Sequence, residues 1–216
     1  MGVDFGQGAR LGGTVTAMLS ECKKCGPNAS MMMMSAFAGS RESVEALLNA
    51  GADPNKVDDA DGYTPLVIAA QRGHETVVEQ LLAGDADPNK TTSRGCTPLF
   101  IAAQNGHTAV VKLLLEKNAK PNKARNVDGA TPLLIAVMNR HESVVELLLA
   151  PGIGTEPNTA DVGGRTPLFV AAESGNLAAA KLLLAAGADK RVKTAWGTAF
   201  EIAVNNEQTE LATLLK

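Results

Sequence analysis

Aromatic residues are scarce in this chain: phenylalanine, tryptophan and tyrosine together make up 3% of its 216 residues. The interior must therefore be built from leucine, valine, isoleucine and alanine, which suits small, closely packed helices. A single tryptophan and a single tyrosine also leave few rings on which nucleic-acid bases could stack. The composition therefore argues against a nucleic-acid partner.

Long apolar runs, excess basic charge and cysteine are lacking as well. No run approaches the roughly 20 apolar residues that span a bilayer, and no secretory signal is evident, so we expect no membrane span. The net charge is -3, which provides no basic field for nucleic acid or an anionic membrane. Three cysteines do not make a disulfide framework, so we expect a reducing compartment, the cytoplasm or nucleus.

The chain instead contains an internal repeat. The triplet Thr-Pro-Leu occurs four times, at steps of 33, 34 and 35 residues, and a degenerate copy, Thr198-Ala199-Phe200, follows 32 residues later. The four triplets begin at Thr64, Thr97, Thr131 and Thr166. Each leads into an alanine-rich stretch, a second apolar stretch and, in most copies, a Pro-Asn turn. Repetition at this period indicates a solenoid, in which one unit stacks on the next.

Within one unit the residue types predict two short helices. Thr64 is a good N-cap because its hydroxyl accepts a hydrogen bond from the first turn, and Pro65 follows at the first helical position. Gly73 allows the left-handed conformation that ends the helix. The second helix carries the valines and leucines of residues 77–82 on one face. Such short helices are marginal alone, so stability must come from stacking.

This pattern resembles the ankyrin repeat, whose unit has about 33 residues and a Thr-Pro-Leu-His-x-Ala signature. The resemblance covers residues 31–216 and implies an all-α solenoid of stacked helix-turn-helix units with β-hairpin finger loops. It divides the chain into repeats at about 31–62, 63–95, 96–129, 130–164 and 165–197, with a C-terminal cap at 198–216. It also places Asn55, Asn89, Asn122 and Asn158 where ankyrin repeats can be hydroxylated.

The chain departs from the family pattern at several positions. The histidine after leucine is replaced, so we expect apolar contacts instead of its hydrogen bonds; the replacements are Val67, Phe100, Leu134, Phe169 and Glu201. The glycine that closes the first helix is Arg140 in one repeat and Glu207 in the last, and we expect those helix ends to turn less tightly. About two extra residues in the segment 151–157 predict a bulge in one finger loop.

The N-terminal part is less regular. Residues 1–13 hold many glycines and are expected to be a flexible terminus. Residues 14–30 are expected to form a degenerate capping helix, in which Pro27-Asn28 mirrors the later Pro-Asn turns. Ser30 is then the expected N-cap of the first full repeat. The run Met31–Met34 fits flexible filler at a terminal repeat or a ligand-binding patch.

Little in the chain points to catalysis or to a cofactor. Cys22 and Cys25 form a lone Cys-x-x-Cys, and a structural zinc site needs a second pair of ligands, so we interpret them as incidental thiols. His74, His107 and His141 follow the inter-helix turn in three successive repeats, too far apart to share one metal, and we interpret them as turn residues. No catalytic motif is present. We therefore expect no enzyme activity, no catalytic residues, no cofactor and no metal.

The expected partner site is the concave surface of the hairpins and first helices. Residues there vary between otherwise regular repeats, so they can set specificity without disturbing the stack. The predicted contact residues are Tyr63, Gln71, Arg72, Arg94, Cys96, Gln104, Asn105, Asp128, Met138, Asn139, Arg165, Glu173 and Trp196. The expected main anchors are Tyr63, Arg94, Arg165 and Trp196, because these residue types dominate interface energies. Replacing one of the anchors Tyr63, Arg94 or Arg165 by alanine should then weaken binding and leave the melting temperature nearly unchanged.

These features favour a non-enzymatic protein–protein interaction module, such as a scaffold, adaptor or inhibitor, acting as a monomer on another protein. One alternative is an accessory or targeting domain of a larger enzyme. Another is a binder of RNA or an acidic ligand through a column of lysines that follow the Pro-Asn turns, Lys56, Lys90 and Lys123.

Overall fold

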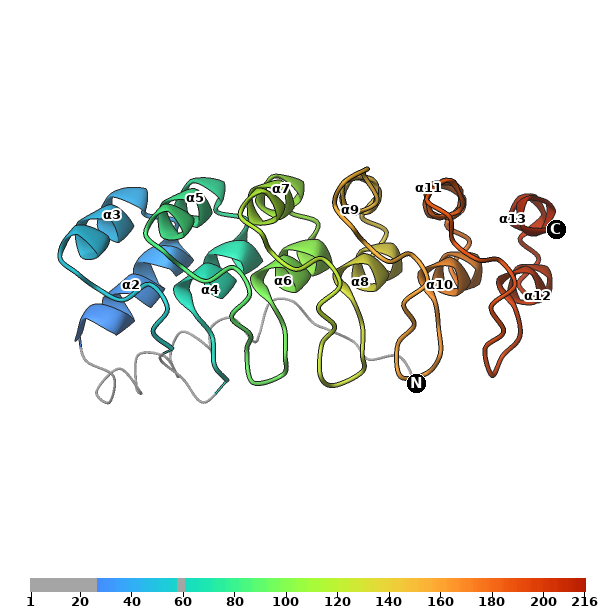
Figure 1. The fold of residues 1–216 in the computed structure, drawn as a ribbon, viewed down its shortest axis with the longest axis horizontal. Helices are drawn as coiled ribbons and strands as arrows, with labels where there is room; N and C mark the ends of the chain where they lie inside the picture. Colours follow the sequence, from blue (N-terminus) through green and yellow to red (C-terminus); the bar gives the residue numbers. More distant parts are fainter. Residues whose placement is uncertain (1–26, 58–60) are drawn as a thin grey trace.

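A computed structural model describes residues 27–57 and 61–216 as a row of paired helices (Figure 1). Six pairs follow one another in the described residues, and each helix contacts its counterparts in the neighbouring pairs. The pairs are α2 (Pro27–Ala38) with α3 (Arg41–Asn49), α4 (Pro65–Arg72) with α5 (Glu75–Ala83), α6 (Pro98–Asn105) with α7 (Thr108–Glu116), α8 (Pro132–Met138) with α9 (Glu142–Leu148), α10 (Pro167–Glu173) with α11 (Leu177–Ala185), and α12 (Ala199–Asn205) with α13 (Thr209–Leu215). The prediction of an all-α stack is confirmed.

The first helix of each regular pair begins at the Thr-Pro signature. The Thr64 hydroxyl accepts a hydrogen bond from Val67 N at 3.2 Å, and Pro65 occupies the first helical position. Thr97, Thr131, Thr166 and Thr198 do the same in their helices. Because a capping hydroxyl satisfies one free amide of the first turn, these threonines fix where each short helix starts. The predicted threonine caps are confirmed.

The core runs the length of the row between the helix pairs. In α4 every residue from Pro65 to Ala70 is buried, which shows that a first helix is covered on all sides by its neighbours. The residues that replace the family histidine are fully buried apolar side chains at Val67, Phe100, Leu134 and Phe169, so the expected apolar contact is confirmed. Glu201 differs: its carboxylate accepts a hydrogen bond from Thr198 N at 2.7 Å, which completes a capping box.

The three histidines join each repeat to the one before it. Nε2 of His74, His107 and His141 lies 3.0–3.1 Å from a backbone carbonyl oxygen near the end of the preceding first helix. A carbonyl oxygen only accepts, so Nε2 carries the hydrogen. Each ring also lies over the glycine that ends that helix; a Cβ built at Gly106 would be 2.6 Å from His141 Nδ1. The histidines are thus inter-repeat contacts as well as turn residues.

Arg140 and Glu207 correct an expectation. Both have φ of 58°, the same left-handed conformation that Gly73 and Gly106 adopt at this place. The helix ends are therefore turned as tightly as in the other repeats. At Arg140 the following repeat carries Asn176 where the three preceding repeats carry histidine, so no ring lies over this position, and the Arg140 guanidinium donates to the Ser174 carbonyl oxygen.

The extra residues after α9 do not enlarge the finger loop. They lie in a turn between Leu149 and Gly154, and Asn122 Nδ2 reaches Gly154 O at 2.8 Å, as Asn89 Nδ2 reaches Asn118 O. Since the loop that follows is back in register, the expected bulge lies at the end of the second helix instead. The backbone of the insertion uses two left-handed glycines, Gly152 and Gly154.

The start of the described chain also differs from expectation. Helix α2 begins at Pro27, so Pro27-Asn28 opens a helix and does not form a turn, and Ser30 lies within α2 instead of capping it. Residues 1–13 and most of the expected capping helix at 14–30 lie outside the described residues. The methionine run is divided: Met32 and Met33 are buried in the core, while Met31 and Met34 are about half exposed.

The finger loops extend from the row of first helices, on the side away from the second helices (Figure 1). Their tips are joined by backbone hydrogen bonds, including Asn126 N to Arg94 O at 3.0 Å and Val162 N to Asp128 O at 2.8 Å. The described residues contain no regular strand in these loops and only one isolated bridge, between Thr194 and Gly197. The predicted β-hairpins are therefore tight loops with few ladder bonds.

Asparagines at the base of the loops connect neighbouring repeats. Asn55 Nδ2 donates to Asp85 O at 2.9 Å, and its Oδ1 accepts from Asp87 N at 2.7 Å. Asn89 and Asn122 make the same two bonds to the next repeat, and Asn158 makes the second of them. Each amide thus satisfies backbone groups that the short helices leave free.

The left-handed helix ends predict opposite effects of two substitutions. Glu207→Gly should stabilise the protein by about 0.5–1 kcal/mol, because a non-glycine residue in this conformation costs about 1–2 kcal/mol and part of that is returned as chain entropy. Gly106→Ala should destabilise it by at least 2 kcal/mol, since both the left-handed φ and the His141 ring oppose a Cβ. Urea unfolding measures both.

The control for these variants is Glu210→Gly, an exposed position inside α13. This change should cost about 1 kcal/mol, as glycine does in a helix interior. A loss of stability in Glu207→Gly comparable to that of Glu210→Gly would contradict the assignment of strain at Glu207.

Candidate partner-binding surface

We define the finger-side surface as the exposed residues of the first helices and the finger loops. The first helices α4, α6, α8 and α10 present only a few of their residues there, because most of each of these helices is buried. In α8, for example, Ile135 is 5% exposed and Met138 is 37% exposed. Exposed positions on this surface are therefore concentrated at the C-terminal ends of the first helices and on the loops.

A cleft of about 590 Å³ lies on this surface between α6 and α8. Four predicted contact residues line it, namely Gln104, Asn105, Met138 and Asn139. The other lining residues are His107, Arg125, Ile135 and His141. The cleft therefore combines amide groups, a guanidinium and the apolar side chains of a methionine and an isoleucine.

Internal hydrogen bonds hold two of the three amide side chains that line the cleft. Asn105 Nδ2 donates to Ile101 O at 2.8 Å, within its own helix. Asn139 Nδ2 donates to Gln104 O at 2.8 Å, so it links α8 to the preceding repeat. Side chains fixed before a partner arrives lose less conformational entropy on binding. This part of the surface is thus preorganised.

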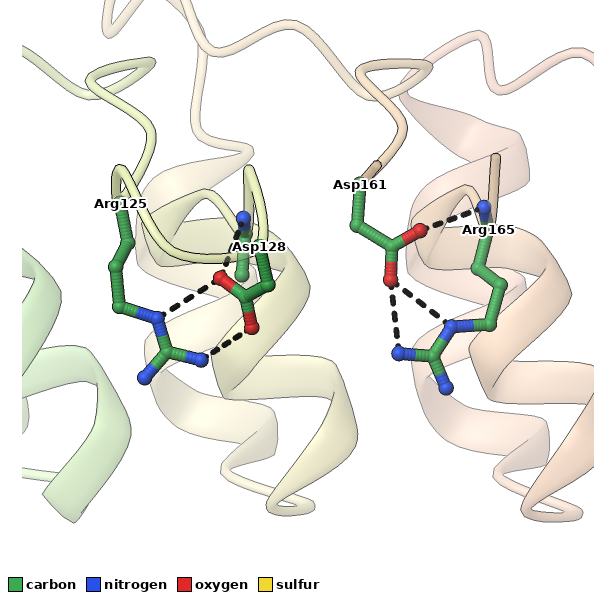
Figure 2. A network of polar contacts seen from close by, with 5 residues as sticks. Arg125, Asp128, Asp161 and Arg165 are labelled. Carbon is green, nitrogen blue, oxygen red and sulfur yellow. Dashed lines mark hydrogen bonds and ion pairs between the residues drawn. The ribbon is translucent and has the colours of Figure 1, made fainter. Parts of the chain in front are cut away.

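Arg125 was not among the predicted residues, and it is fixed by two contacts. Its Nε donates to Asp128 Oδ1 at 2.9 Å and a second nitrogen bonds the other carboxylate oxygen (Figure 2). The guanidinium also lies 4.9 Å from the centre of the Phe100 ring. The hydrogen bond from Arg125 lowers the pKa of Asp128, and the same bond raises the pKa of Arg125. Both carboxylate oxygens of Asp128 are therefore occupied by the bond to Arg125.

Arg165 forms a second pair of the same kind. Its Nε and a terminal nitrogen lie 2.9 and 2.8 Å from Asp161 Oδ2, and its backbone N donates to Oδ1 (Figure 2). The Asp161 side chain is only 4% exposed. A buried carboxylate without its partner is costly. The expectation that alanine at Arg165 leaves the melting temperature unchanged therefore conflicts with this geometry.

The remaining predicted residues fall into two groups. Cys96 is 6% exposed, so its side chain does not face a partner, and Tyr63 is half-buried against the core. Gln71 is also partly buried, and Arg72 lies over the Phe37 ring at 4.2 Å while remaining exposed. The exposed group consists of Arg94, Glu173 and Trp196. The predicted contact residues therefore include side chains that pack inside the protein as well as side chains that a partner could reach.

The lysine column is partly used inside the protein. Lys90 Nζ donates to the Asn55 carbonyl oxygen at 2.6 Å and is only partly exposed. Lys56 also takes part in a contact. Lys123 remains exposed. This column is therefore not the uniform row of free ammonium groups that the sequence pattern indicated.

The described ranges, 27–57 and 61–216, contain no candidate metal site and no candidate membrane span. No group of three histidine, cysteine or acidic side chains there is placed to hold a metal ion. No described helix is long and apolar enough to cross a bilayer. Cys22 and Cys25 lie outside the described residues.

Sequence reasoning missed Arg125 and Ile135. Arg125 could have been found from its spacing to Asp128, since a loop arginine three residues before an aspartate can form a local pair. Ile135 is nearly buried, and only the curvature of the α6–α8 surface brings it to the cleft wall.

Comparison with known families gives one match. A family model described as ankyrin repeats, in three copies, matches four overlapping segments, residues 11–92, 31–125, 76–161 and 120–194. A comparison with curated proteins finds no match for the chain.

Removing the Arg165 guanidinium should destabilise the protein. Arg165→Ala is expected to cost about 2–4 kcal/mol, because it leaves the Asp161 carboxylate buried and unpaired. The double variant Asp161→Ala with Arg165→Ala should recover part of this loss, and urea unfolding of the wild type, the single variants and the double variant measures the coupling. A melting temperature unchanged in Arg165→Ala would show that the pair contributes nothing.

Lowering the pH should remove the stabilisation that the Asp128–Arg125 ion pair gives to the folded protein. Its folded-state pKa is lowered from the ordinary value of 3.8, so the stabilisation is present above that pH and disappears as pH falls through the lower folded-state value. The stability difference between wild type and Asp128→Ala should therefore be constant from pH 5 to pH 7 and shrink below about pH 4. The exposed Glu116 is the control, since Glu116→Ala should show little difference at any pH.

Proposed function

Because the chain belongs to the ankyrin-repeat family, whose members are generally protein–protein interaction modules, we propose that it binds another protein through its finger-side surface. The observation that carries this proposal is the preorganised cleft between α6 and α8. It is bounded by Gln104, Asn105, Met138 and Asn139, which the helix stack does not need for burial.

The chemistry of the cleft suits a polypeptide partner. Amide groups can donate and accept hydrogen bonds from a peptide backbone, and the Arg125 guanidinium can add a charge-assisted bond. Met138 gives an adaptable apolar contact at the centre. The combination of a small apolar centre with polar edges is the usual composition of a protein interface.

A non-enzymatic role as scaffold, adaptor or inhibitor fits this surface best. Only ankyrin repeats match the chain, and they are typically non-catalytic. The partner is expected to meet a monomer of this chain, with Arg94, Met138 and Trp196 as its principal exposed contacts. Arg165 is no longer expected to be an anchor, because its guanidinium forms an ion pair with the buried Asp161 carboxylate.

The proposal is tested with a photo-crosslinking amino acid placed at Met138 in the full chain. On exposure to light in cells it should capture a defined protein, which mass spectrometry identifies. The matched control is the same amino acid at Lys112, an exposed position on the second helix α7. Capture of the same protein from Lys112 and not from Met138 would place the interface on the opposite side.

Once the partner is identified, substitutions measure the contribution of the cleft, at Met138, and of a finger tip, at Arg94. Met138→Ala and Arg94→Ala should each weaken binding about tenfold or more, since truncation of a central contact costs about 2 kcal/mol. Their melting temperatures should stay close to that of the wild type, because both side chains are exposed. Glu79→Ala and Lys112→Ala should change neither quantity.

A further inference from the structure

Three consecutive finger loops carry an exposed apolar side chain at their tips. Val127 is 66% exposed, Val162 is 80% exposed and Trp196 is 56% exposed. The preceding loop has the polar residues Ser93 and Arg94 at its tip. Large apolar side chains are seldom left exposed in a row, and contiguous exposure of this kind marks an interaction site.

The three tips form one continuous row. Val162 N donates to Asp128 O at 2.8 Å, which holds the second tip against the first. A Cβ built at Gly129 would lie 3.3 Å from Val162 Cγ1, and one at Gly163 would lie 3.6 Å from Trp196 Cη2. The Val162 side chain therefore lies against the backbone of the preceding tip at Gly129, and the Trp196 ring lies against the backbone of its preceding tip at Gly163.

Positive charge lies on the loop that carries Trp196, with Lys193 next to its tip and Lys190 and Arg191 at its base. Lys190, Arg191 and Lys193 are exposed on the same loop as Trp196, and none of them makes an ion pair within the described part of the chain. The carboxylates at the neighbouring tips are already neutralised, since Asp128 pairs with Arg125 and Asp161 with Arg165. An acidic partner therefore meets attraction here and little repulsion.

The spacing of the tips selects a conformation for that partner. Adjacent packed helices lie about 8–10 Å apart, so we expect the loops that precede them to repeat at a similar distance. A polyproline II segment has three residues per turn and rises about 3.1 Å per residue, so every third side chain lies on one face about 9 Å from the last. In a β-strand, residues three apart point to opposite faces.

We propose that the row of Val127, Val162 and Trp196 binds an extended acidic segment of another protein, in which an apolar side chain recurs at every third residue. The segment lies across the three tips in a polyproline II conformation, with its carboxylates attracted by Lys193 next to the last tip and by Lys190 and Arg191 further down the same loop. This inference rests on the proposed function, because it names the chemistry of a partner for the finger-side surface.

Trp196 itself reports on this binding, since it is the only tryptophan of the chain. The probe is a synthetic peptide with leucine at every third position and aspartate or glutamate elsewhere. Added to the purified full chain, it should shift the tryptophan emission to shorter wavelength and saturate. Two matched peptides, one with serine for each leucine and one with lysine for each acid, should bind at least tenfold more weakly.

Variants of the chain locate the site. Val162→Asp should weaken binding of the acidic peptide about tenfold or more, since it removes an apolar contact and adds a like charge. The matched control is Val57→Asp, an exposed valine on the first finger loop, which should leave the affinity unchanged. Circular dichroism should show both variants folded, because both positions are solvent-exposed.

Three results would overturn the inference. These are no emission shift with the acidic peptide, equal binding of the serine-substituted peptide, or equal affinity in Val162→Asp. A stronger response to a single-stranded RNA or to phosphatidylserine vesicles would assign the row to a different class of partner. Crosslinking at Met138 remains independent of these outcomes, so failure of the peptide leaves the proposed function standing and failure of crosslinking does not.

Discussion

Hydrogen bonds from side chains to the backbone of a neighbouring repeat are the interactions on which this structure depends. Helices of seven to twelve residues are too short to persist alone. His74, His107 and His141 bond free carbonyls at the ends of the first helices, and Asn55, Asn89 and Asn122 bond the loop backbone of the next repeat. Each bond links residues about one repeat apart, so stability is shared along the array.

The same arrangement explains where a binding surface can arise. The histidine contacts use backbone carbonyls in the last turn of the first helices, and the finger tips are joined through backbone amides and carbonyls, so most side chains at these two places are not required to hold the stack together. Those two places are consequently free to vary. Met138 and Asn139 use the end of a first helix, while Val162 and Trp196 use the tips. A partner that spans both would contact one continuous surface.

Much of the fold follows from local rules that a sequence displays directly. A threonine before proline predicts a helix start, and the repeat period predicts the stack, because both depend on residues close together in the chain. Glu207 and Arg140 were different. Their backbone is set by the tight turn that joins the two packed helices of a pair, which overrides the preference of a single residue for negative φ.

The candidate site was predictable only in part for a similar reason. Variation between repeats identified Gln104, Asn105, Met138 and Asn139, and the structure brings these four around one cleft. Variation between repeats did not distinguish a residue that is free to contact a partner from a residue whose side chain is bonded within the protein. Arg165 varies like its neighbours, yet its guanidinium is held by a carboxylate four residues away that the loop buries. Cys96 likewise occupies a variable position whose side chain points inward.

The contact between a helix-ending glycine and the following histidine has a consequence for how such an array can change over generations. Gly73 with His107 and Gly106 with His141 belong to different repeats but occupy one space, and Arg140 occurs where the next repeat has Asn176. The two members of a junction must therefore be inherited together. A duplication or exchange with its boundary between the two residues could place a residue such as Arg140 opposite a histidine ring, and the two side chains would clash. An exchange that transfers both residues together preserves the contact.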